Sequence, residues 1–126
     1  MDLKACTADI IDSGYCVHST LGPGLLESAY HKCLAHELRL RGRSVCWKVA
    51  IPVEYKGLRI PVGYQADLVI DDAVIVEVKT VDRIHPIHEA QLLTYLRLTG
   101  LTVGLILNFH ETLFRDGIRR LVNNYK

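Results

Sequence analysis

A chain of 126 residues with 49% hydrophobic residues and a net charge of +1 is long enough for one domain with a buried core. No apolar run approaches the roughly 20 residues that cross a bilayer, and the first four residues, MDLK, do not begin an apolar signal region. We therefore expect a single cytoplasmic domain that makes no contact with membranes.

The four cysteines stand singly, without the CxxC spacing that is typical of zinc and iron–sulfur ligation. We expect free thiols, most of them packed in the interior. These residues are Cys6, Cys16, Cys33 and Cys46.

Charge is distributed unevenly along the sequence. Residues 32–59 contain seven basic and two acidic residues, a net of +5, whereas residues 67–89 carry six acids against two basic residues, a net of −4. Four more basic residues follow position 114. An acidic centre between basic flanks suits a metal site bordered by a phosphate-binding surface. The alternative is ordinary solvated charge on helices and strands.

Two helices are predicted in the first third of the chain. Residues 7–21 form an apolar stripe at helical spacing, and Gly-Pro-Gly at 22–24 ends this helix and begins the next. The second helix is predicted over 25–40 and ends at 41–42. The first stripe contains Ile10, Gly14, Val17, His18 and Leu21, and the second contains Leu26, Ala29, Tyr30 and Cys33.

Three strands rich in Val and Ile follow, the first two joined at Lys56-Gly57. Pro52 and Pro61 imply an edge strand or irregular pairing in the first two. The strands are predicted over 44–55, 58–70 and 74–80.

Pro86 begins a third helix that is predicted over 86–99. The continuous apolar run at 103–109 is typical of a strand that is covered on both faces, often parallel to a neighbour. Residues 117–122 form either a last strand or a short helix. The order α-α-β-β-β-α-β predicts an α/β fold, a mixed sheet with helices on its faces.

Charged residues gather on one face of a predicted hairpin. If the turn at 71–73 has three residues, Asp67 lies opposite Glu77, and Lys79 shares their face because it is two residues from Glu77. The other face of the hairpin is apolar. Charge inside a packed sheet is costly unless it is paired or bound to metal. Two carboxylates and an ammonium group are what a divalent-metal phosphodiesterase needs.

These groups suggest one mechanism. Mg²⁺ or Mn²⁺ prefers oxygen ligands, which Asp67, Glu77 and the main-chain carbonyl of Val78 would supply. Lys79 would orient the attacking water and neutralise charge on the phosphate. Glu27 lies at the edge of the second helix's apolar stripe, and is either half-exposed or directed inward. If it is directed inward, it would add a ligand through water or help to hold a second metal.

On the third helix, Gln91 and Tyr95 are four residues apart and share a face, with His88 one turn before them. They would position the substrate backbone or the attacking water. Leu93 and Leu96 lie on the opposite side and are expected to carry the packing. The alternative is that Gln91 and Tyr95 belong to a solvent-exposed polar face.

The arrangement of these segments resembles the PD-(D/E)XK nuclease superfamily, whose motif is written here as Ala66-Asp67 followed by Glu77-Val78-Lys79. Ala66 replaces the Pro of the motif name. QLLTY at 91–95 looks like the QxxxY motif of the RecB-like branch, and GLLESAY at 24–30 looks like the signature of the bacterial GxxExxY family. The resemblance covers residues 10–122.

The resemblance implies a four-stranded mixed sheet flanked by helices, a PD-(D/E)XK (restriction-endonuclease-like) core. It also implies Mg²⁺ or Mn²⁺ as cofactor. Some RecB-like relatives bind an iron–sulfur cluster through four cysteines that flank the motifs. All four cysteines here precede Asp67 and none follows Gln91, so we expect no cluster. His18 could approach the metal as in related nucleases, but we favour a core histidine, and we do not expect His85 and His88 to bind zinc.

The leading hypothesis is therefore a nuclease that acts on DNA in repair, recombination or defence. Without a recognisable module that reads bases, sequence specificity would need a partner, and cutting both strands of a duplex would need a homodimer or a larger complex. The second hypothesis is a non-catalytic module that binds nucleic acid or joins a complex while keeping the fold. A third is a hydrolase of another phosphoester.

Overall fold

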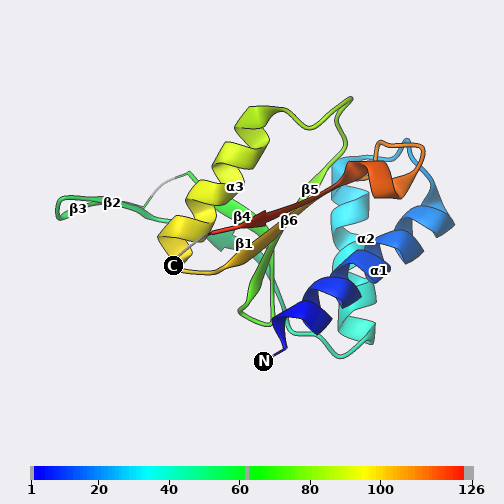
Figure 1. The fold of residues 1–126 in the computed structure, drawn as a ribbon, viewed down its shortest axis with the longest axis horizontal. Coiled ribbons are helices and arrows are strands. Elements are labelled where there is room, and N and C mark those ends of the chain that lie inside the picture. Colours follow the sequence, from blue (N-terminus) through cyan, green and yellow to red (C-terminus); the bar gives the residue numbers. More distant parts are fainter. Residues whose placement is uncertain (1, 62, 124–126) are drawn as a thin grey trace.

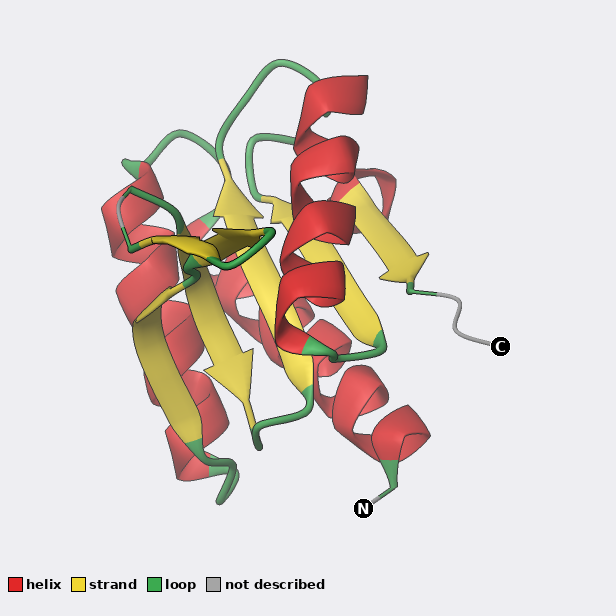
Figure 2. Cartoon of the chain, turned by 90° about the vertical axis from the view of Figure 1, so that its left-hand side faces the viewer, coloured by secondary structure: helices red, strands yellow, loops and turns green. Residues whose placement is uncertain are grey.

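A five-stranded mixed sheet lies at the centre of the computed structural model, which describes residues 2–61 and 63–123 (Figure 1). Helices α1 (Leu3–Leu21) and α2 (Glu27–Leu40) pack on one face, and α3 (Pro86–Thr99) packs on the other (Figure 2). The strands, in their order across the sheet, are β1 (Val45–Ala50), β4 (Gln65–Ile70), β5 (Val74–Lys79), β6 (Val103–Asn108) and β7 (Ile118–Val122).

The central strands β5 and β6 are parallel, and every other neighbouring pair is antiparallel. All six residues of β6 are buried, which confirms the prediction of a strand covered on both faces. The predicted α/β class with a mixed sheet is also confirmed. The sheet has five strands rather than four, because a 3₁₀ turn at Phe114–Gly117 leads into β7, where the sequence left a strand or a short helix open.

The prediction of two long strands over 44–55 and 58–70 is wrong in its bounds. Each is interrupted next to a proline, Pro52 or Pro61, which cannot donate to a strand ladder. The interruption releases a separate hairpin of β2 (Val53–Tyr55) and β3 (Leu58–Ile60), which projects from the domain (Figure 1). We call this hairpin, with the turn at Lys56-Gly57, the arm.

Each face of the sheet carries its own apolar core. Residues of α1 and α2 cover one face, and Leu92, Tyr95 and Leu96 of α3 cover the other. The prediction that Tyr95 lies opposite the packing side of α3 was wrong: Tyr95 is 4% exposed, whereas Leu93 is only partly buried. The helix is rotated so that Tyr95 faces the sheet.

Arg41 and Arg43 join the helical layer to the sheet. Arg41 pairs with Asp9 at 2.7 Å and Glu37 at 2.9 Å, while Arg43 pairs with Asp9 at 2.8 Å and Asp71 at 2.9 Å. The hydrogen bond from Arg43 and, to a smaller extent, the one from Arg41 lower the pKa of Asp9. These two arginines of the basic stretch at 32–59 are therefore structural, whereas the sequence left open whether the stretch binds phosphate or is ordinary surface charge.

None of the helices in residues 2–61 and 63–123 is both long and apolar enough to cross a membrane.

Candidate active site

The register of the β4–β5 hairpin is the one that the sequence predicted. Ile70 pairs with Val74 across the three-residue turn, and Leu68 pairs with Val76. Asp71 and Asp72 in the turn have positive φ angles of 54° and 53°, a conformation that Asp tolerates better than most residues. Because the register is fixed, the next positions along the two strands bring Asp67 and Glu77 together.

At Asp67 and Glu77, hydrogen bonds to side chains take the place of main-chain hydrogen bonds between β4 and β5. The Asp67 N–H donates to Oε2 of Glu77 at 2.9 Å, and the Val78 N–H donates to Oδ2 of Asp67 at 2.8 Å. Each carboxylate thus binds the main chain of the opposite strand. The exchange holds both acids at the junction of β4 and β5 and leaves their other oxygen atoms for further partners.

The carbonyl of Asp67 points to the opposite side of the sheet, where it accepts a hydrogen bond from Nε2 of His31 at 3.0 Å. His31 is 6% exposed and stacks on Trp47 with ring centroids 4.3 Å apart. Lys48, across from this point in β1, has a positive φ of 50°. β4 is therefore locally irregular at Asp67, and His31 holds the irregular peptide. The sequence analysis missed His31, whose only signal was its position next to Tyr30 and one turn after Glu27.

Glu77 is 5% exposed, and its pKa is raised from 4.5 to about 8, chiefly by burial. The negative charge of Asp67 is the second cause of this rise, that of Glu27 contributes less, and Lys79 acts in the opposite direction. The described part of the chain contains no ion pair to Asp67, Glu77 or Lys79. Without a cation the site therefore favours the protonated form of Glu77, because Lys79 does not offset the burial and the charge of Asp67.

A divalent cation fits this donor set. Two carboxylates and nearby main-chain carbonyls are hard oxygen donors of the kind that Mg²⁺ and Mn²⁺ prefer. Among the residues that the structure describes, no group of three His, Cys, Asp or Glu side chains lies close enough to enclose a metal. Mg²⁺ commonly completes its shell with water and substrate oxygens, so a two-carboxylate site is sufficient for it.

Glu27 is the first residue of α2 and is exposed. Tyr30, fully buried and stacked on Phe109 with centroids 4.7 Å apart, fixes the entry to this helix. Its hydroxyl donates to the carbonyl of Gly22 and accepts from the Leu25 N–H at 3.1 Å. The helix start is thereby anchored with the Glu27 charge close enough to influence Glu77.

The strand end that carries Lys79 is held from β6. The Lys79 carbonyl accepts from the Phe109 N–H at 2.9 Å. The fully buried Asn108 accepts from the Val81 N–H at 3.1 Å and donates to the Val81 carbonyl at 2.9 Å. These bonds make the exit from β5 rigid, so that the position of the Lys79 side chain depends on a fixed backbone.

α3 borders the site from the other side. Burial raises the pKa of Tyr95, and the charges of Glu77 and Asp67 raise it further, which places Tyr95 beside the carboxylates. Burial lowers the pKa of His88, and the Lys79 charge adds to that effect. The first turns of α3 thus lie near the charged hairpin, and Gln91 is partly exposed one turn before Tyr95.

Two other histidines, His18 and His85, do not belong to the group of candidate site residues. His18 is buried against Phe114, and its Nε2 donates to the carbonyl of Glu111 at 2.7 Å, as expected for a core histidine. His85 precedes α3 and donates its main-chain N–H to Nδ1 of His88 at 3.1 Å. This contact fixes the start of the helix, and the two rings meet edge to face with centroids 5.7 Å apart.

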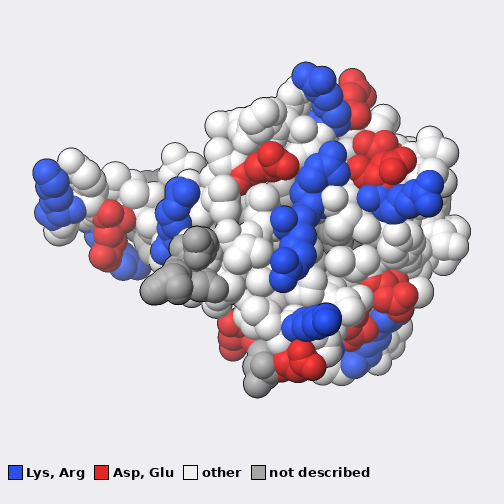
Figure 3. Space-filling view, in the orientation of Figure 1, with Lys and Arg blue, Asp and Glu red and all other residues white. Residues whose placement is uncertain are grey.

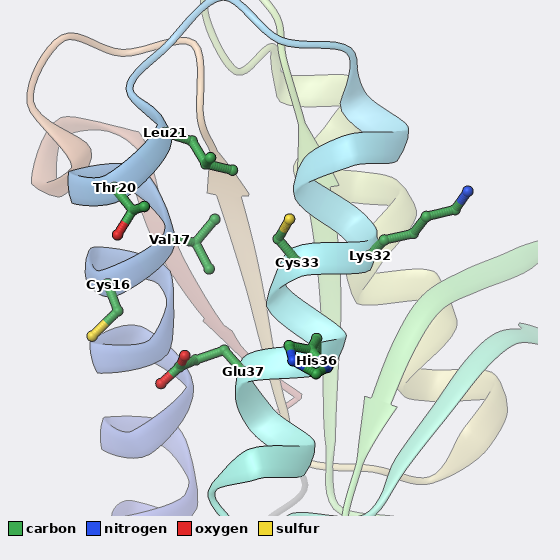
Figure 4. Close-up of a pocket in the computed structure, with 8 residues that line it drawn as sticks. All are labelled: Cys16, Val17, Thr20, Leu21, Lys32, Cys33, His36 and Glu37. Atoms are coloured by element: carbon green, nitrogen blue, oxygen red, sulfur yellow. The ribbon is translucent and has the colours of Figure 1, made fainter.

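A separate pocket of about 320 Å³ lies between α1 and α2 (Figure 4). Cys33 and Glu37 extend from α2 toward α1, whereas Lys32 points away. The thiols at the pocket, Cys16 and Cys33, are free. The expectation of buried thiols is wrong for most of the four, because only Cys6 is buried and Cys16 and Cys46 are exposed. This pocket belongs to the helical layer and contains none of the predicted site residues. The absence of an iron–sulfur cluster stays a prediction.

A mixed sheet with helices on both faces, and a hairpin that joins D…ExK side chains, is the architecture of a PD-(D/E)XK fold. A sequence model of the PD-(D/E)XK nuclease superfamily matches residues 4–121, and the chain belongs to this superfamily. Its members are generally nucleases that cleave phosphodiester bonds with Mg²⁺ or Mn²⁺. No curated protein and no solved structure matches the chain. The closer assignments of residues 24–30 to the GxxExxY family and of 91–95 to the RecB-like branch stay predictions.

Proposed function

We propose that this protein is a Mg²⁺- or Mn²⁺-dependent nuclease that hydrolyses phosphodiester bonds of DNA in repair, recombination or defence. The observation that carries the proposal is the exchange of hydrogen bonds across the hairpin, in which the Asp67 N–H donates to the Glu77 carboxylate and the Val78 N–H donates to the Asp67 carboxylate. These hydrogen bonds hold two carboxylates together at a junction where Lys79 does not offset the burial of Glu77 and the charge of Asp67.

The proposed roles follow from the positions of the side chains. Asp67, Glu77 and the carbonyl of Val78 would hold the metal, and Glu27 would add a ligand through water. The metal, when bound, polarises a phosphoryl oxygen and lowers the pKa of water. Lys79 would hold the attacking water and compensate charge on the phosphate. Gln91 and Tyr95 would position the substrate backbone.

The charge on the surface supports a polyanionic substrate. Figure 3 shows Lys and Arg side chains on the arm and across the centre of the same face. Lys48 and Lys56 are exposed, and neither forms an ion pair with a carboxylate of the described residues, whereas Arg59 pairs with Glu54 at 3.0 Å. Exposed lysines without a carboxylate partner, in β1 and at the tip of the arm, would bind phosphates of a nucleic acid.

Cleavage of end-labelled single-stranded, duplex and branched DNA tests the proposal, with Mn²⁺, Mg²⁺ or EDTA. We expect cutting that needs metal and that Asp67→Asn abolishes. Asp72→Asn is the matched control, because it removes an exposed carboxylate from the turn of the same hairpin. Cutting that persists in Asp67→Asn would refute the role of this site.

The second candidate is a nucleic-acid-binding module in which the carboxylates serve only the fold. The main-chain bonds of Asp67 and Glu77 favour it, because they give both side chains a structural use. A folded wild-type protein that binds DNA equally in EDTA and Mn²⁺ and cuts no substrate would support this candidate.

For the proposed nuclease, a homodimer would supply the two sites that cutting both strands of a duplex requires. Light scattering measures this oligomeric state.

A further inference from the structure

A second pocket of about 310 Å³ lies between α3 and the root of the arm. α3 and the arm are on the same face of the sheet (Figure 2). The volume is at the lower end of the range of pockets that bind small ligands. Its lining includes Val53, Tyr64, Ile87, Gln91, Tyr95 and Leu98.

We propose that this pocket binds an unpaired nucleobase beside the scissile phosphate, so that the substrate is a single strand or an unpaired end rather than an intact duplex. The inference rests on the proposed nuclease function and names the substrate class of the same site.

The pocket shares two residues with the candidate active site. Gln91 and Tyr95, to which we assign the positioning of the substrate backbone, also line the pocket. Tyr95 packs in the same apolar cluster as Ala66, the neighbour of Asp67, and lines the pocket together with Tyr64. A nucleotide whose phosphate lies at the carboxylates would therefore have its base directed toward Tyr64 and α3.

The lining has the chemistry that a base needs. Tyr64 is 48% exposed and Ile87 is 70% exposed, so an aromatic and an aliphatic side chain stand at the pocket with accessible apolar surface. Bases stack on such side chains regardless of sequence. The Gln91 amide offers both a donor and an acceptor to a base edge.

A base within a duplex is stacked and paired, and extracting it costs a few kcal/mol. An unpaired base enters a pocket without that cost. The arm also carries positive charge, because Lys56, in the turn at its tip, meets no carboxylate within ion-pair distance in the described residues. A stacking pocket beside a basic arm is the combination that single-strand-binding proteins use.

The test measures binding of fluorescein-labelled DNA by anisotropy in Ca²⁺, which allows binding without requiring turnover. The probes are a 12-nucleotide single strand, the matching duplex, and the same strand with one abasic site moved along it. We expect the single strand to bind more tightly than the duplex. An abasic site at one position should weaken binding roughly 5- to 150-fold, the effect of losing one stacked base.

Tyr64→Ala and Ile87→Ala should weaken binding of the intact strand by a similar factor and leave the abasic strand unchanged. Leu40→Ala is the matched control, because Leu40 is 69% exposed and lies at the end of α2, away from the pocket. Fluorescence of 2-aminopurine at the sensitive position should be quenched by the wild type and less by Tyr64→Ala.

The outcomes separate this inference from the function on which it rests. If the wild type cuts DNA but every variant keeps the same preference for the intact strand, the pocket does not bind a base, and the nuclease proposal stands. If the wild type binds no nucleic acid, both fail. If Ile87→Ala changes only the oligomeric state, the pocket is a protein contact and the inference is wrong.

Discussion

His31 donates a hydrogen bond through Nε2 to the main-chain carbonyl of Asp67, 3.0 Å away on the opposite side of the sheet from the carboxylates. The bond fixes the peptide at the point where β4 leaves regular pairing. The direction of the Asp67 carboxylate therefore depends on a side chain that does not reach the proposed metal position.

Replacing His31 by Ala should lower the free energy of unfolding by about 1–3 kcal/mol, because a buried carbonyl loses its partner. The freed Asp67 peptide should also weaken Mn²⁺ binding several-fold. Urea unfolding and calorimetric titration with Mn²⁺ measure the two effects. The control is His36→Ala, which removes an exposed histidine from the same helix. Unchanged Mn²⁺ affinity in a folded His31→Ala protein would show that His31 serves packing alone.

The stability of the metal-free protein should fall as pH rises from about 4.5 to about 8. Glu77 has a pKa of about 8 in the folded protein, raised from 4.5, so between these values the folded state holds a proton that the unfolded state has released. The unfolded state binds fewer protons, and stability therefore decreases with pH. Thermal melts in EDTA across this range measure the effect.

Glu77→Gln supplies the comparison for the pH dependence. Since the amide cannot ionise, this variant should lack the decline, and at pH 8 without metal it should be more stable than the wild type. Added Mn²⁺ should stabilise the wild type at pH 8 and have little effect on Glu77→Gln. Parallel pH profiles for the two proteins would contradict the assignment of the decline to Glu77.

Lys79→Ala should abolish cleavage with little change in stability. The Lys79 side chain is partly exposed and, among the described residues, forms no ion pair, so its removal breaks no structural contact that the structure records. Single-turnover cleavage and urea unfolding measure the two properties, with Lys4→Ala as an exposed lysine control. A Lys79→Ala protein that fails to fold would identify the lysine as a structural partner of the acids.

Arg43 and Lys56 should behave differently although both lie in the basic stretch. Arg43→Ala should cost about 1 kcal/mol of stability, since its ion pairs with Asp9 and Asp71 are partly exposed. Lys56→Ala should leave stability unchanged and reduce the salt dependence of DNA binding by about one phosphate contact. Titrations at several salt concentrations test both, and equal effects on DNA binding would contradict the structural role of Arg43.

The hairpin that carries the candidate site could be predicted because two local signals agree. Turn residues at 71–73 and the spacing of Asp67 and Glu77 define one register, and the structure has that register. A register error of one residue would have moved the acids to the apolar face. Strand pairing across a short turn is therefore a property that sequence alone can specify.

Other features depend on contacts between distant segments. His31 meets Asp67 across 36 positions, and a single histidine beside the apolar stripe of the second helix gives no sign of such a partner. Arg43 looked like free positive charge, since its acids lie 34 and 28 positions away. Tyr95 was placed on the wrong side of α3 because the packing against β4, β5 and β6, rather than the hydrophobic pattern, determines the rotation of this helix.

The two ends of the arm are joined by a main-chain hydrogen bond at the edge of the β1–β4 pair. The Ile51 N–H donates to the carbonyl of Tyr64 at 2.8 Å, so the chain leaves the β1–β4 pair and returns to it at neighbouring positions. Topologically, the arm is an elongated loop of an ordinary hairpin. Its length and sequence can diverge, or be replaced by a short turn, without changing the register of β4 and β5. The fold thus separates the part that can evolve new ligand contacts from the part that holds the acids.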